Sequence, residues 1–233
     1  MLLTLPFASA QIPDKFTNLQ VLPKDISKQE LTSRMRIFSF SLGARCEDCH
    51  ADKAPGSELR DFASDAKDTK KKAREMMRMV EALNKDYVAK LQPATSTRVD
   101  CATCHHGVMK PRSLQAVLSE ELEKKDLASA LALYKDLRKK YYGGAQYDFS
   151  ETSVNQLTES LLAAHKTKEA AAFMELNDQS TTLTGWGRSL IAMSHQANGE
   201  TDKAIADFQK IVDGNPNDAW AKKQLEQLKG GKQ

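Results

Sequence analysis

The sequence is poor in glycine and proline, with 11 and 7 among its 233 residues, and aromatic residues make up only 6%. So few turn-forming residues argue against a β-sandwich or a barrel and favour helices. No run of residues is long and apolar enough to form a membrane helix. The net charge is only +3, so overall charge does not indicate a nucleic-acid partner. The composition therefore predicts an all-α protein of one or two domains.

The first ten residues form a short apolar run, MLLTLPFASA, that ends in small residues typical of a signal-peptide cleavage site. The run is too short to span a bilayer. We expect residues 1–10 to be the remnant of a signal peptide that is cleaved before Gln11. This interpretation predicts an exported, periplasmic protein that is soluble after cleavage.

Cysteine is scarce, and all four cysteines lie in two short motifs, CEDCH from Cys46 to His50 and CATCH from Cys101 to His105. C-x-x-C-H is the attachment signature of c-type haem. Its two thiols, here Cys46 with Cys49 and Cys101 with Cys104, form thioethers to one haem. The histidine that follows binds the iron. We expect two covalent c-type haems, which agrees with export.

Other readings of the cysteines explain less. A disulfide framework suits a secreted protein but gives no role to the two histidines. A zinc site from two C-x-x-C pairs leaves the histidines unexplained and joins distant segments. A thioredoxin-like pair requires a βαβ context that the sequence lacks.

The other side of each haem iron can take methionine, histidine or no protein ligand, and the helix before the first motif offers a candidate. Asp25 or Ser27 can cap that helix, and Gly43 ends it. Met35 shares one face with Leu31, and the spacing directs this face toward the haem. Spacing alone leaves open whether Met35 binds iron, which favours electron transfer, or only fills the core.

A second helix, predicted over residues 68–91, precedes the second motif and carries Met76, Met77 and Met79. Met76 begins a stripe of apolar residues, and Met77 points elsewhere. Spacing alone does not choose between Met76 and Met79. His106 and Met109 follow His105 too closely to reach the opposite face of the same haem.

Together, these units resemble the cytochrome c subunit of photosynthetic reaction centres. MRIFSFSLGARCEDCH is similar to its units M-x-x-F-x-x-x-L-G-x-x-C-x-x-C-H, and AREMMRMVEALNKDY…VDCATCHHG to its units A-R-x-M-x-x-M-x-x-x-N…V-x-C-x-T-C-H-x-G. The resemblance covers residues 16–112, half of that four-haem subunit. It implies Met35 and Met76 as axial ligands. The loop over residues 92–98 is longer than in the Met-ligated unit, so Met79 and a distant histidine, His165 or His195, remain alternatives.

The segment after Pro111 differs from the haem units. Residues 184–218 resemble a tetratricopeptide repeat, with Ala204 and Phe208 at consensus positions and His195 where that consensus has tyrosine. Ala170 with Met174, and Ala130 with Tyr134, occupy the same slots in two earlier, degenerate pairs. We therefore expect a dihaem domain over residues 11–111 and a helical-repeat module with a capping helix over residues 112–233.

These features predict a dihaem electron carrier whose repeat module docks it to a redox partner, such as a membrane-bound electron-transfer complex. A dihaem peroxidase is the alternative and needs one displaceable haem ligand. A third interpretation makes the repeats the main function. The basic residues from Lys70 to Arg78 steer an acidic partner or form a solvated face.

Overall fold

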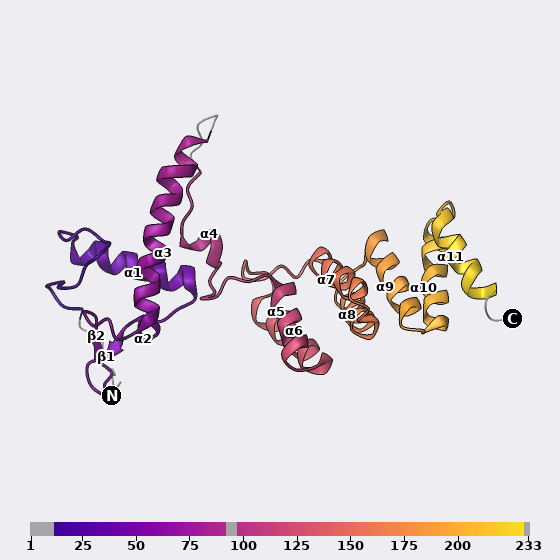
Figure 1. The fold of residues 1–233 in the computed structure, drawn as a ribbon, viewed down its shortest axis with the longest axis horizontal. Helices are drawn as coiled ribbons and strands as arrows, with labels where there is room; N and C mark the ends of the chain where they lie inside the picture. The colour runs from indigo at the N-terminus through magenta and orange to yellow at the C-terminus, as the bar shows by residue number, and fades with distance from the viewer. Residues whose placement is uncertain (1–11, 92–96, 231–233) are drawn as a thin grey trace, which may run out of the picture. The chain divides into compact units, whose positions relative to one another are not determined.

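The structure is a computed structural model that describes residues 12–91 and 97–230. The expected signal segment lies outside the described residues. Nearly all described elements are helices, as composition predicted, and the chain divides into two compact units, residues 1–111 and 112–233 (Figure 1).

The N-terminal unit contains the two C-x-x-C-H motifs, each with a helix before it. Its order is α1 (Lys28–Leu42), α2 (Cys46–Cys49), β1 (Ala51–Asp52), β2 (Arg60–Asp61), α3 (Asp68–Ala82), a π-helix (Leu83–Tyr87), a 3-10 turn (Val88–Lys90) and α4 (Cys101–His105). The strands pair antiparallel. α1 begins and ends where the sequence indicated. Ser27 caps it by accepting a hydrogen bond from the Glu30 N–H, and Gly43 ends it with a φ of 59°.

The helix expected over residues 68–91 is not α-helical throughout. It changes to a π-helix at Leu83 and to a 3-10 turn at Val88. The change in pitch interrupts the apolar stripe predicted to begin at Met76, and Tyr87 within the π-helix is 68% exposed. The interruption places Asn84 where its side chain bonds the segment that leads to α4.

The C-terminal unit consists of helices joined by short connections, except for a longer one over residues 142–150. They are α5 (Leu114–Lys124), α6 (Leu127–Tyr141), α7 (Glu151–Ala163), α8 (Thr167–Ser180), α9 (Gly185–Ala197), α10 (Thr201–Gly214) and α11 (Ala219–Gly230). α5 packs against α6, and each helix from α7 to α10 packs against the next one; α7 also packs against α5 and α9. The six residues assigned to the repeat slots are almost fully buried: Ala130, Tyr134, Ala170, Met174, Ala204 and Phe208.

The two units differ sharply in their apolar cores. Both clusters of buried hydrophobic residues lie in the C-terminal unit. Among the described residues of the N-terminal unit, the buried hydrophobic residues are Ile26, Leu31 and Ala44. Large apolar side chains lie exposed instead, including Phe40 at 81% and Ile37 at 56%. A protein unit of this size normally buries far more apolar surface, so its own side chains do not account for its cohesion.

Candidate haem sites

Each C-x-x-C-H motif folds into a short helix, α2 for the first and α4 for the second. In both helices the same motif position makes a hydrogen bond that closes the first turn. The residue before the second cysteine bonds back to the backbone N–H just ahead of the first cysteine. Asp48 accepts from the Arg45 N–H at 2.7 Å, and the Thr103 hydroxyl accepts from the Asp100 N–H at 3.0 Å. The C-x-x-C-H signature itself leaves this position unspecified. These two equivalent hydrogen bonds each hold one pair of thiols on a single helical turn.

The thiols are available for covalent attachment. All four cysteines are free, Cys46 and Cys104 are exposed, and Cys49 and Cys101 are half-buried. Burial is the largest influence on Cys49 and Cys101 and raises the pKa of both thiols. Among the described residues, no group of three or more histidine, cysteine or acidic side chains could hold a metal ion by itself. The spacing of each thiol pair and the histidine after it fits thioether attachment to haem.

His105, the histidine of the second motif, is buried and oriented by the backbone. Its Nδ1 lies 2.9 Å from the Val108 carbonyl oxygen, to which it donates when that nitrogen carries the proton. This tautomer leaves the Nε2 lone pair free for a metal, the arrangement usual for ligating histidines. His106 follows in the left-handed conformation, with a φ of 48°, and is exposed. Of this histidine pair, only His105 is buried and oriented.

His50, the histidine of the first motif, is held differently. Its ring packs edge-on against Phe62, with 5.0 Å between centroids, and its Nδ1 is buried with no partner among the described residues. Burial, followed by the nearby charges of Lys70 and Arg74, lowers the pKa of His50 to about 4. His50 is therefore neutral at pH 7 and has a lone pair available for iron.

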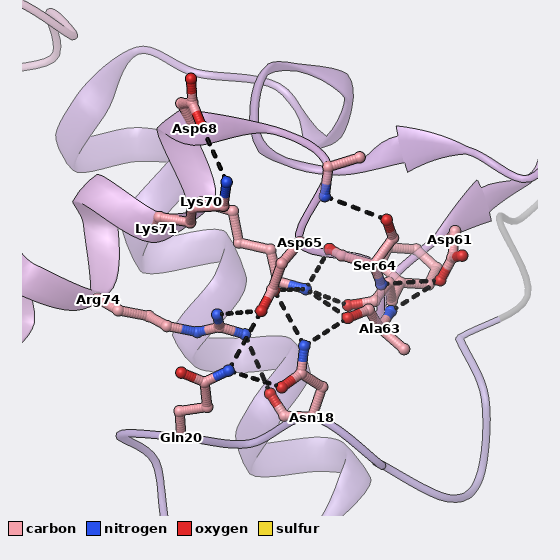
Figure 2. Close-up of polar contacts among 12 residues, drawn as sticks. Asn18, Gln20, Asp61, Ala63, Ser64, Asp65, Asp68, Lys70, Lys71 and Arg74 are labelled. Carbon is pink, nitrogen blue, oxygen red and sulfur yellow. Dashed lines mark hydrogen bonds and ion pairs between the residues drawn. The ribbon is translucent and has the colours of Figure 1, made fainter.

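Lys70 and Arg74 belong to a polar cluster that joins α3 to two loops (Figure 2). Arg74 contacts Asp65 at 2.8 Å and the Asn18 carbonyl at 3.1 Å. Lys70 donates to the carbonyl oxygens of residues 62, 63 and 64. The Arg74 and Asn18 hydrogen bonds hold the pKa of Asp65 well below its usual range. The sequence left the basic residues from Lys70 to Arg78 as either a partner-steering patch or a solvated face. Two of them, Lys70 and Arg74, are engaged within the N-terminal unit.

The helix that precedes each C-x-x-C-H motif packs against the short helix of the other motif. α1, which carries Met35, packs against α4 of the second motif. α3, which carries Met76, packs against α2 of the first motif, and the Thr69 hydroxyl donates to the Asp48 carbonyl at 2.5 Å. The prediction from spacing did not include this exchange, because it depends on contacts between distant segments.

The side chains of the predicted methionine ligands are partly exposed to solvent. Met35 is half-buried on α1. Met76 and Met79 on α3 are 40% and 48% exposed, so neither serves as an ordinary core residue. His165, a remote candidate, is exposed at the turn after α7. The other, His195, is buried, and both of its ring nitrogens face carboxylates, Nδ1 that of Asp207 at 2.7 Å and Nε2 that of Glu175 at 3.2 Å.

Paired thiols, each followed by a neutral or backbone-oriented histidine, define a cytochrome of the c type. Comparison with known proteins identifies the family. A family model described as "Photosynthetic reaction centre cytochrome C subunit" matches residues 7–206, and the chain belongs to that family. The match extends well past the haem motifs to α10. Membership implies covalently bound haem.

A curated relative, cytochrome c-554 of Chloroflexus aurantiacus, is 34% identical over 98 residues. The aligned part is 42% of this chain and 22% of the relative. The chain thus spans less than a quarter of that relative's length. Among the residues that the structure describes, no helix has the length and apolar character needed to cross a membrane.

Proposed function

We propose that the chain is an exported, periplasmic dihaem c-type cytochrome that carries single electrons between redox partners. Cys46 with Cys49, and Cys101 with Cys104, would attach the two haems. His50 and His105 would bind the irons on one side. Met35 and Met76 would bind them on the other, with Met79 as the alternative to Met76. When bound, a c-type haem supplies an iron that gains or loses one electron.

The observation that carries this proposal is how few apolar side chains the described residues of the N-terminal unit bury. The buried hydrophobic residues described there are Ile26, Leu31 and Ala44, while apolar side chains of α1 and α3 lie exposed. Two bulky apolar groups, tethered at the motifs, would cover such surfaces. The family match and the two neutral or oriented histidines support the same interpretation.

We further propose that residues 112–233 are a tetratricopeptide-like module that docks the cytochrome to its partner. The support is the burial of all six slot residues and the left-handed Gly199, with a φ of 78°, between α9 and α10. Stacked helix pairs form extended surfaces that suit protein partners. The family implies that the partners are redox proteins, and we propose a membrane-bound electron-transfer complex as the partner.

The spin state of the ferric protein tests this function. A carrier with methionine on both irons is six-coordinate and low-spin, so optical and electron paramagnetic resonance spectra should show two low-spin haems. A stable high-spin fraction that turns over peroxide would contradict the carrier and favour a dihaem peroxidase. Adding peroxide to the reduced protein separates the two, because a carrier lacks a displaceable ligand.

A further inference from the structure

The end of α1 meets the turn that follows the second motif. The Gly107 N–H donates to the Ser41 carbonyl oxygen at 2.9 Å, across 66 residues of sequence. Gly43, the cap of α1, lies so close that a Cβ added there would stand 2.0 Å from the Gly107 carbonyl oxygen. A contact that short requires the backbone to move. Gly43 is therefore needed both for its φ of 59° and for this close approach.

The same turn orients an iron ligand. From Gly107 the chain passes to Val108, whose N–H donates to the His105 carbonyl and whose own carbonyl oxygen lies 2.9 Å from His105 Nδ1. A continuous set of contacts thus leads from α1 through the turn to the imidazole of the second motif. α1 belongs to the first haem unit, since it carries Met35 and leads into Cys46.

We infer that the α1 terminus at Ser41 and Gly43 is the positioning element for His105, so that the first haem unit sets the ligand geometry of the second. The inference rests on the proposed dihaem function. The Val108 carbonyl makes the His105 imidazole a stronger electron donor, and a stronger donor stabilises ferric iron. Displacing the turn weakens that hydrogen bond and favours ferrous iron. A substitution at Gly43, which lies just before the first motif, should therefore affect the haem attached at the second motif.

Gly43→Ala is the test, and Gly56→Ala is its matched control. Gly56 also has a positive φ, 77°, but a Cβ there would meet nothing within 4 Å, so its variant has the backbone strain without the clash. Spectroelectrochemical titration should show an upward shift in the midpoint potential of the second-motif haem in Gly43→Ala and no shift in Gly56→Ala. A Cys46→Ala/Cys49→Ala variant, with haem at the second motif alone, assigns the two potentials. An unchanged second-motif potential, or a shift confined to the first-motif haem, would overturn the inference.

Hydrogen exchange on the unaltered holoprotein keeps the inference testable if Gly43→Ala fails to mature. The Gly107 amide should exchange much more slowly than the amide of exposed Gly56. Equal exchange at the two glycines would show that the α1 contact does not exist. A wild-type protein without covalent haem would contradict the proposed function instead, and the intact mass shows this independently of Gly107 exchange.

Discussion

The side-chain amide of Asn84 pairs with the backbone of Val99 through two hydrogen bonds. Asn84 Nδ2 donates to the Val99 carbonyl at 2.8 Å, and the Val99 N–H donates to Asn84 Oδ1 at 2.9 Å. The same Nδ2 also donates to the Val80 carbonyl of α3 at 2.9 Å. Val99 lies two residues before Cys101. Asn84 therefore fixes the second motif to the helix that carries its candidate methionine ligands.

Replacing Asn84 by aspartate keeps the shape of the side chain but removes the donor. The carboxylate would then face two carbonyl oxygens, so we expect a loss of about 1–3 kcal/mol in unfolding free energy. Haem occupancy at the second motif should fall relative to the first, measured by mass spectrometry of the two haem peptides. Asn217→Asp at an exposed turn of the C-terminal unit serves as the control and should leave occupancy unchanged. Equal loss of haem at both motifs would argue against a local role.

The methionine assignments predict separable effects on the two haems. Met35→Ala should convert the first-motif haem to high-spin and lower its potential, because the thioether raises the potential. Met76→Ala should do the same at the second motif. Met109→Ala, which removes an exposed methionine near His105, is the control and should alter neither spectrum. If Met79→Ala reproduces the effect expected of Met76→Ala, the second ligand is Met79.

Loss of haem should unfold the N-terminal unit alone. Its described residues bury few apolar side chains, whereas the C-terminal unit has its own core. A variant with all four cysteines changed to serine should expose residues 12–111 to protease and preserve a fragment that begins near Arg112. Trp186 and Trp220, the two tryptophans, both lie in that fragment and report its unfolding by fluorescence. Protease resistance of residues 12–111 in this variant would contradict a haem-dependent core.

His195 makes the stability of the C-terminal unit depend on pH. Its burial favours the neutral ring, but hydrogen bonds to Asp207 and Glu175 outweigh this and raise the pKa of His195. A raised folded pKa stabilises the fold fully below the unfolded value, about 6.5, and this stabilisation is lost as pH rises through the folded pKa. The pKa values of Asp207 and Glu175 are lowered, so their share is lost as pH falls below about 4.5.

We therefore expect the C-terminal unit to be most stable between about pH 4.5 and 6.5. The groups that face the ring or its partners are Glu175, Glu200, Lys203, Asp207 and Lys210. His195→Gln should cost about 1–2 kcal/mol at pH 6 and less at pH 8, measured by denaturant unfolding followed by tryptophan fluorescence. His165→Gln, at an exposed turn, is the control. An equal loss at both pH values would show that the charge of His195 does not contribute.

Local signals in the sequence predicted local structure well. Ser27 and Gly43 marked the ends of α1 because capping depends on a few adjacent residues. The spacing of Ala204 and Phe208 identified buried positions for the same reason, since helical periodicity decides which face packs. The C-x-x-C-H motifs identified the candidate haem-binding cysteines and histidines, because these residues lie within five consecutive positions.

Contacts between distant segments were not predictable from the sequence. The π-helix that begins at Leu83 contains Asn84, which donates a hydrogen bond to the Val99 carbonyl. Hydrophobic periodicity predicts neither feature. Phe62 packs on His50 from a loop with no motif of its own. The approach of Gly43 to Gly107 joins the ends of two different haem units. A glycine at a helix end predicts a cap but not which segment lies against it.

The number of covalent haems per chain tests the account most directly. The intact mass of the mature protein should exceed the polypeptide mass by two haems, and one should be lost in Cys46→Ala/Cys49→Ala and the other in Cys101→Ala/Cys104→Ala. A mature protein with one haem or none, whose remaining C-x-x-C thiols react freely with an alkylating reagent, would contradict the dihaem assignment.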